Sequence, residues 1–216
     1  MLKISLDNCG KNYHRTWLFR GVQLEIPIVA GNSFAILGPN GAGKSTFTLM
    51  LTGQVSPTEG QLSWSSDNLL IPESQWCQYY SLSSPALELP EEFTVEEWFQ
   101  YHRQLKPFID GFELSELIEL CEFPNKIRNK PLMHYSSGMK QRIKLCLSFF
   151  GNEALSILDE PLTNLDKKGI ELYQNLVQRF TNQKCFVVAS NREDEYYFCN
   201  NKLTISKENP SIIHLE

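Results

Sequence analysis

The chain has 216 residues, of which 42% are hydrophobic and 21% are charged, and its net charge is −5 at pH 7. This length and hydrophobic content predict one globular domain with a substantial core, which excludes a short module. Lysines and arginines are scattered along an acidic chain, so no positive field would attract nucleic acid, and we expect no nucleic-acid partner.

The cysteines and the apolar segments indicate where the protein works. The six cysteines form no C-x-x-C pair, and several lie in apolar stretches such as Lys144–Leu147. This usage is typical of reduced thiols in the core of a cytosolic protein. The first eight residues alternate like a strand, and no window approaches 18 apolar residues. We therefore expect a cytoplasmic protein that does not cross a membrane by itself.

The N-terminal segment has the alternation of β-strands. Apolar and polar residues alternate over Leu2–Leu6 and over Val22–Ile28. Two half-buried strands are therefore expected, forming an antiparallel β-element before the first glycine-rich loop. Tyr13 lies in the connection between them. Its aromatic face could stack on a purine base, or it could simply pack against its neighbours.

A glycine-rich loop follows between an expected strand and an expected helix. Residues 38–46 read Gly-Pro-Asn-Gly-Ala-Gly-Lys-Ser-Thr and contain the spacing G-x-x-x-x-G-K-[ST] of a P-loop. The apolar run Phe34–Leu37 predicts a buried strand, and Ser45–Thr52 predicts the helix. At such a turn, backbone N–H groups converge on phosphate oxygens near the positive end of the helix. This context predicts nucleotide binding.

The P-loop residues have distinct expected roles. Lys44 would neutralise the β and γ phosphates of ATP, and Ser45 would bind Mg²⁺. The whole loop is expected to contact the nucleotide, through Gly38, Pro39, Asn40, Gly41, Ala42, Gly43, Lys44, Ser45 and Thr46.

The middle of the chain changes from strand to helix patterns. Strands are expected near Gln61–Trp64 and at Gln78–Ser83, after which strand patterns stop until Ala154. The stretch between them is mostly helical in pattern. We therefore predict a single domain in which residues 86–150 form an inserted helical subdomain, and residues 1–85 and 151–216 form the ATP-binding core.

Three helices are expected in that subdomain. Thr94 and Glu97 have the spacing of a capping box at the start of the first helix, which continues to about Leu105. A second helix is expected at Leu114–Cys121. The third begins within Tyr135–Arg142 with Ser136 as its N-cap, and its N-terminus is a second potential anion site.

Two carboxylates end the next buried strand. The hydrophobic run from Ala154 leads to Asp159 and Glu160. Charged groups at the end of a buried strand are costly unless they bind a partner, so these two residues are candidates for a functional role. Asp159 is expected to hold Mg²⁺ with Ser45. Glu160 is placed to orient or deprotonate an attacking water.

The C-terminal part alternates between helix and strand patterns. A helix is expected at about Lys167–Phe180, and a buried strand at Cys185–Ser190 that ends at Asn191. Two alternating segments, Leu203–Ser206 and Ile212–Leu215, end the chain. With the preceding segments they predict an α/β fold built on a P-loop NTPase core.

These pieces, in this order, resemble the ATP-binding subunit of ABC (ATP-binding cassette) transporters over nearly the whole chain. GPNGAGKST at 38–46 looks like the Walker A motif, and YSSGMKQR at 135–142 like the signature motif. LSILDEP at 155–161 looks like Walker B, and TNLD at 163–166 like the D-loop.

The resemblance implies how the site is completed. In this family ATP is sandwiched in a head-to-tail dimer, between the P-loop of one copy and the signature helix of the other. A homodimer is thus implied, in which Ser136, Ser137 and Gly138 bind ATP across the interface. By the same resemblance, Tyr13 becomes the residue that stacks on adenine.

The sequence departs from the family's pattern at several positions. Ser83 aligns where a glutamine normally contacts Mg²⁺ and water, and Asn191 occupies the position of the switch histidine. In the signature, Ser137 replaces the first glycine and Met139 the usual glutamine. We expect ATP binding to survive these changes more easily than turnover.

The expected function is that of the energy-coupling subunit of an ABC transporter. The chain would be a Mg²⁺-dependent ATPase in which Glu160 is the base, Lys44 binds the phosphates, and Asn191 stands near the γ-phosphate. It would dock through residues 83–105 on a separate membrane-spanning subunit, at the inner face of the cell membrane. The alternatives are a soluble ABC ATPase for cellular assembly or repair and a slow ATP-gated dimerisation clamp. The second is favoured by Ser83 and Asn191 and opposed by Glu160.

Overall fold

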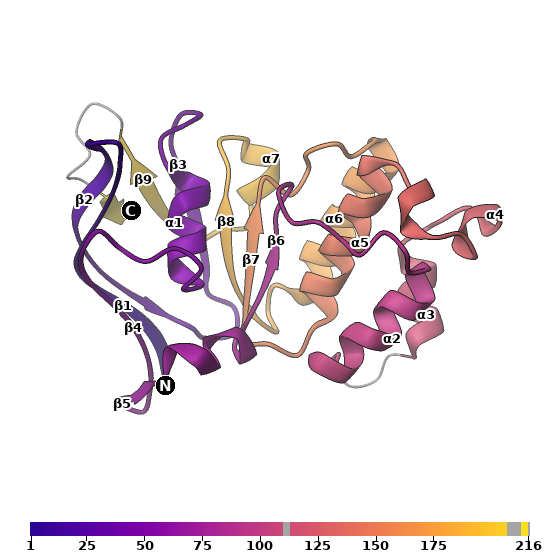
Figure 1. Ribbon diagram of the computed structural model, residues 1–216, viewed down its shortest axis with the longest axis horizontal. Helices are drawn as coiled ribbons and strands as arrows, with labels where there is room; N and C mark the ends of the chain where they lie inside the picture. The colour runs from indigo at the N-terminus through magenta and orange to yellow at the C-terminus, as the bar shows by residue number, and fades with distance from the viewer. Residues whose placement is uncertain (110–112, 207–212, 216) are drawn as a thin grey trace.

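The computed structural model describes residues 1–109, 113–206 and 213–215, and it contains two β-sheets and a group of helices (Figure 1). A small antiparallel sheet lies at one end of the molecule, the larger sheet lies in the middle, and most helices lie at the other end. Helix α1 (Lys44–Leu51) lies between the two sheets.

The N-terminal strands form the antiparallel sheet. Its order is β2-β1-β4-β5, with β1 at Leu2–Tyr13, β2 at Thr16–Pro27, β4 at Glu59–Ser66 and β5 at Leu69–Ile71. Ile4 pairs with Ile26 on one side and with Trp64 on the other, and all three side chains are buried. Alternation directs one face of the sheet into the core. The predicted antiparallel element is confirmed.

The larger sheet has the order β10-β9-β3-β8-β7-β6. Its strands are β3 (Ser33–Leu37), β6 (Tyr80–Ser83), β7 (Leu155–Asp159), β8 (Cys185–Ala189), β9 (Asn201–Ile205) and β10 (Ile213–Leu215). Neighbouring strands are parallel except β10, which is antiparallel to β9. The carboxyl ends of the parallel strands therefore meet at one edge, where ligands bind in open α/β sheets.

Helices cover the rest of the sheet and form the far end of the molecule. They are α2 (Val95–Leu105), α3 (Leu114–Leu120), α4 (Asn125–Arg128), α5 (Ser137–Phe150), α6 (Lys167–Phe180) and α7 (Glu193–Tyr196). The predicted capping box is present. The Glu97 N–H donates to Thr94 Oγ1 over 3.3 Å, and the Thr94 N–H donates to Glu97 Oε2 over 2.8 Å.

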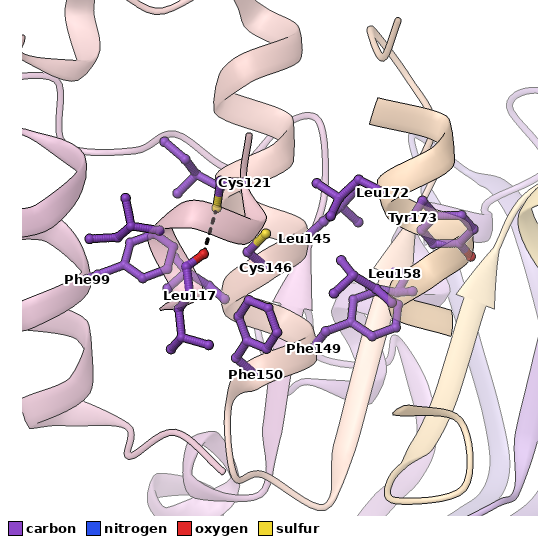
Figure 2. Packing of buried hydrophobic residues seen from close by; sticks show 14 of the residues in the cluster. Phe99, Leu117, Cys121, Leu145, Cys146, Phe149, Phe150, Leu158, Leu172 and Tyr173 are labelled. Carbon is purple, nitrogen blue, oxygen red and sulfur yellow. Dashed lines mark hydrogen bonds between the residues drawn. The ribbon is translucent and has the colours of Figure 1, made fainter. Parts of the chain in front are cut away.

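The helices share one hydrophobic cluster with the larger sheet, as Figure 2 shows. Phe149 from α5 and Tyr173 from α6 pack with Leu158 from β7, and Phe99 from α2 belongs to the same cluster. Ten of the fourteen residues of α5 are buried. This helix therefore packs against both the sheet and the other helices.

Some elements differ from their predicted bounds. The strand expected at Gln78–Ser83 begins at Tyr80, because the preceding residues, Glu73–Gln78, form a 3₁₀ helix. Trp76 in this helix is buried. Ile212, expected to open the last strand, lies outside the described residues. In the part of the chain that the structure describes, no helix is both long and apolar enough to cross a membrane.

Candidate nucleotide-binding site

The P-loop follows β3 at the carboxyl edge of the larger sheet and leads into α1. Gly43 is the N-cap of α1 and has a φ of 105°, which strongly favours glycine. A Cβ on Gly38 would lie 2.5 Å from the carbonyl oxygen of Ile205, so only glycine fits between the loop and β9. Lys44 is 5% exposed, and its Nζ donates to the carbonyl oxygen of Gly38 over 2.8 Å. The ammonium is therefore held at the loop itself.

A cavity of about 330 Å³ opens beside the P-loop. Its lining joins the loop to the tip of the β1–β2 hairpin and the end of β7, through Tyr13, Leu18, Asn40, Gly41, Gly43, Lys44, Ser45, Thr46 and Glu160. Loop residues predicted to contact nucleotide thus share one cavity with Tyr13. This common lining supports the predicted site.

Tyr13 reaches the cavity because of the hairpin turn after it. Tyr13 pairs with Thr16, and the two residues between them, His14 and Arg15, have φ values of 48° and 67°. Both residues have a left-handed backbone conformation, as in the two-residue hairpin turns whose twist matches that of the strands. Tyr13 is 46% exposed, and Lys11 Nζ lies 5.1 Å from the centroid of its ring. A planar base could stack on this ring.

Asp159 ends β7 beside the P-loop and is almost fully buried. Burial raises the pKa of its carboxyl group, while hydrogen bonds from Ser45 and Ser84 oppose this rise. Ser84 Oγ donates to Asp159 Oδ2 over 3.3 Å. Asp159 Oδ1 is buried and has no hydrogen-bond partner among the described residues. A buried carboxylate oxygen of this kind is suited to accept a cation or a water molecule.

The residues present fit Mg²⁺. A hydroxyl and a carboxylate are the oxygen donors that this ion prefers, and Ser45 and Asp159 line the same cavity. Within the described residues, no three His, Cys, Asp or Glu side chains gather as a metal site. In nucleotide sites Mg²⁺ commonly takes one or two protein ligands, with phosphate oxygens and water for the rest.

Glu160 has a strained backbone. Its φ is 43°, which is unusual for a residue other than glycine, and such residues concentrate at functional sites. The conformation is held by the Glu160 N–H, which donates to the carbonyl oxygen of Ala189 over 2.9 Å. Thr163 Oγ1 donates to Glu160 Oε2 over 3.3 Å. Glu160 lines the P-loop cavity, as a residue that activates water would require.

Asn191 lies at the P-loop. Its Nδ2 donates to Asn40 Oδ1 over 3.1 Å, which joins the segment after β8 to the loop after β3. Arg192, the next residue, instead forms an ion pair with Asp194. The cation beside Asn191 is therefore engaged away from the P-loop.

The structure gives Ser84, rather than Ser83, the position beside Asp159. Ser83 is fully buried, and its Oγ has no hydrogen-bond partner among the described residues. Ser83 pairs with Leu158 in the parallel sheet, so Ser84 is level with Asp159. Sequence reasoning missed Ser84, because the register of β6 against β7 is needed to place it.

The signature segment does not reach the P-loop cavity of its own chain. Ser136 is the N-cap of α5, and its side chain accepts a hydrogen bond from the Met139 N–H over 3.2 Å. A Cβ on Gly138 would lie 2.5 Å from the carbonyl oxygen of Asn164, which brings α5 against the segment after β7. Ser137 and Asn164 line a different cavity from the P-loop. The predicted nucleotide contacts therefore fall into two separate places on one chain.

The sequence is similar to those of known transport proteins. A sequence model of the ABC transporter family matches residues 21–163. The lantibiotic transport ATP-binding protein SrtF of Streptococcus pyogenes is 30% identical over 200 residues, covering 88% of this chain and 79% of that protein. The cytochrome c biogenesis ATP-binding export protein CcmA of Idiomarina loihiensis is 31% identical over 159 residues, covering 73% and 70%.

Other relatives are much longer. ABC transporter A family member 12 of Arabidopsis thaliana is 29% identical over 197 residues, which cover 86% of this chain and 20% of that protein. The chain thus spans about a fifth of the length of this and similar curated relatives.

Solved structures share the fold. The dimeric post-hydrolysis state of the ATP-binding cassette MJ0796, bound to ADP and Pi, matches with a TM-score of 0.79 at 19% identity, covering 99% of this chain and 97% of that one. A bacterial Atm1-family ABC exporter with ATP bound matches with a TM-score of 0.75 at 19% identity, covering 96% and 38%. The chain therefore belongs to the ABC transporter family, as an ATP-binding cassette with a P-loop fold.

Proposed function

We propose that the chain is the energy-coupling subunit of an ABC transporter, which hydrolyses ATP as a head-to-tail homodimer. One observation carries the proposal. The P-loop cavity contains Lys44 and Glu160, whereas the signature segment at Ser136 lies outside that cavity. A second copy could supply the missing N-terminus of α5 to the phosphates. The dimeric state of the MJ0796 cassette, which shares this fold, supports this arrangement.

Each residue of the site has a separate role in the proposed reaction. The backbone N–H groups of the P-loop and the ammonium of Lys44 bind the phosphates. Ser45 and Asp159 hold Mg²⁺, which when bound neutralises charge on the phosphates. Glu160 orients the attacking water and accepts its proton. Tyr13 stacks on the adenine at the open side of the cavity.

The membrane partner would dock on residues 83–105. This segment connects the end of β6 with α2 and exposes several large apolar side chains, including Leu87, Tyr101 and Leu105. Exposed large apolar side chains support an interaction surface when they gather in one patch. The names of SrtF and CcmA, a transport protein and an export protein, support a transport role. The chain would then lie at the inner face of the membrane through its partner.

A second candidate is a slow ATP-gated clamp. Asn191 hydrogen bonds to the P-loop at the place where the family has a histidine, and it carries no titratable proton. Ser83, at the position where the resemblance places a glutamine, is fully buried, and the group beside Asp159 is the short hydroxyl of Ser84. Both features favour tight binding with slow chemistry.

Hydrolysis under single-turnover conditions tests the proposal. We expect wild-type protein to hydrolyse ATP with Mg²⁺ and not with EDTA, and Glu160→Gln to be slower by roughly a hundredfold or more. Glu122→Gln is the matched control. The backbone of Glu122 is also in the left-handed region, with a φ of 55°, but this residue is exposed and lies outside the site. Equal rates for wild type and Glu160→Gln would contradict the role of Glu160.

A further inference from the structure

Lys144 is a buried cation on the helix that begins at the signature segment. It lies two turns into α5 and is 7% exposed. Its ammonium donates to three backbone carbonyl oxygens, of Ser84 over 2.7 Å, of Leu87 over 3.2 Å and of Pro85 over 3.4 Å. Burying a charge is costly unless its hydrogen bonds are satisfied. All three acceptors belong to one short turn, so this turn is what the buried charge stabilises.

The same turn carries the hydroxyl that contacts Asp159. The Leu87 N–H donates to the carbonyl oxygen of Ser84 over 3.1 Å, and the Ala86 N–H donates to Ser84 Oγ over 3.3 Å. Ser84 Oγ in turn donates to Asp159 Oδ2 and leaves Oδ1 free. Lys144 is therefore linked to the carboxylate proposed to bind Mg²⁺ through one residue, because it holds the backbone carbonyl of Ser84 and the hydroxyl of Ser84 holds Asp159.

The turn also separates two cavities. Pro85 and Leu87 line a cavity of about 430 Å³ that contains Asp159 and Glu160. They also line a cavity of about 380 Å³ that contains Ser137 of the signature segment and Lys144. The segment is thus a thin wall between the hydrolysis side of the site and the signature helix, and Lys144 fixes this wall to the helix.

We propose that Lys144 is a positioning residue, which holds Ser84 on Asp159 and makes the position of this hydroxyl depend on the position of helix α5. The inference rests on the proposed function. Lys144 and Ser136 lie two turns apart on one continuous helix, so a shift of the α5 N-terminus on contact with a second copy would reach Ser84 through Lys144. Burial, and secondarily the nearby Lys140, lowers the pKa of Lys144 to about 8, so at neutral pH the ammonium keeps three donors.

Strand β6 offers a matched control. Lys106 also comes from the helical part of the chain, and its Nζ donates over 2.6 Å to the carbonyl oxygen of Tyr80, at the opposite end of β6. Lys144 and Lys106 therefore hold the two ends of one strand, but only Lys144 holds the end beside Asp159. Lys144→Met and Lys106→Met both remove a lysine that anchors β6, so a general loss of stability should appear in both variants.

Two measurements test the inference: the Mg²⁺ concentration for half-maximal binding of labelled ATP, and the single-turnover rate of hydrolysis. For Lys144→Met we expect this concentration to rise about fivefold and the rate to fall about tenfold, with ATP affinity in EDTA unchanged within about twofold. Lys144→Arg keeps the positive charge and the hydrogen-bond donors, so its Mg²⁺ concentration and its single-turnover rate should lie closer to those of wild type. Lys106→Met should match wild type in both, and thermal melts would show that each variant folds.

A double-mutant cycle shows whether Lys144 acts through Ser84. Ser84→Ala should reproduce the effect of Lys144→Met, and the double variant should lose no more than the larger single effect. Additive effects, or a Lys144→Met variant that behaves like Lys106→Met, would overturn the inference while leaving the proposed function intact. A wild-type protein that does not bind ATP would overturn both. If wild-type hydrolysis is too slow to measure, the Mg²⁺ titration of ATP binding decides alone.

Discussion

Lys44 is buried, and its ammonium donates to backbone carbonyl oxygens of the P-loop. Its ammonium lies on the carbonyl oxygens of Gly38 and Pro39, close to where the phosphates of a nucleotide would lie. A cation in this position is arranged for an anionic ligand. The structure therefore gives Lys44 a large expected effect on binding and a small one on the fold.

We expect Lys44→Ala to abolish or greatly weaken Mg²⁺-dependent ATP binding, because an uncompensated polyphosphate would then lie in the loop. Titration with labelled ATP measures this effect. Lys202→Ala, at an exposed lysine of the neighbouring strand β9, serves as the control and should bind like wild type. Equal affinities for Lys44→Ala and wild type would remove Lys44 from the site.

Asn191 is the clearest departure from the family at the residue scale. A histidine can hold the γ-phosphate and the attacking water, whereas an amide offers hydrogen bonds but no titratable proton. We expect Asn191→His to raise kcat by roughly tenfold to a thousandfold, with little change in ATP affinity. Single-turnover hydrolysis decides this, and unchanged rates would mean that the family's histidine role does not apply here.

At the scale of elements, local signals predicted most of the fold. The capping box of Thr94 and Glu97 fixed the start of α2, and Asp166 likewise caps α6, accepting from the Gly169 N–H over 2.9 Å. Such signals act within a few residues, so they are visible in the sequence. The short elements β5, α4 and α7 have too few residues to show a period.

The site was predictable where one motif contains all its parts, as in the P-loop. It was not predictable where parts meet across the sheet. Ser84 reaches Asp159 only through the register of β6 and β7, and Lys144 reaches Ser84 over sixty residues of sequence. Contacts of this kind depend on tertiary packing, which no local pattern encodes.

A buried charge cluster joins three elements at the opposite edge of the sheet. Glu153, before β7, lies 3.8 Å from the Nζ of Lys184, before β8, and 3.5 Å from the Nζ of Lys106, after α2. Lys184 also donates to the carbonyl oxygens of Ser148 and Gly151 at the end of α5. Burial lowers the pKa of Lys184 to about 8, against the opposing effect of Glu153.

The lowered pKa of Lys184 predicts a pH effect on stability. Between pH 8 and about 10.4 the unfolded chain binds more protons at this lysine than the folded chain, so the free energy of unfolding rises with pH. We expect wild type to gain about 2 kcal/mol from pH 8 to 10 relative to the double variant Glu153→Gln/Lys184→Met, which lacks both charges. Urea unfolding at both pH values measures this, and a constant difference would contradict the lowered pKa.

At the scale of the whole molecule, the residues proposed to contact the nucleotide are divided between two places. The P-loop, Asp159 and Glu160 lie at the carboxyl edge of the larger sheet, and Ser136 lies at the start of α5, outside the P-loop cavity. In the proposed dimer, a second copy brings these places together around ATP. Dimerisation should therefore depend on nucleotide and be strongest when hydrolysis is blocked.

The most direct test is the mass of Glu160→Gln in solution, by size-exclusion chromatography with light scattering. The change removes the base but keeps the shape of the side chain, so ATP stays bound between the copies. We predict one chain per particle without nucleotide and two with ATP and Mg²⁺, whereas Lys44→Ala/Glu160→Gln should stay at one chain in both. A mass of Glu160→Gln that does not change with ATP would contradict the sandwich dimer on which the account depends.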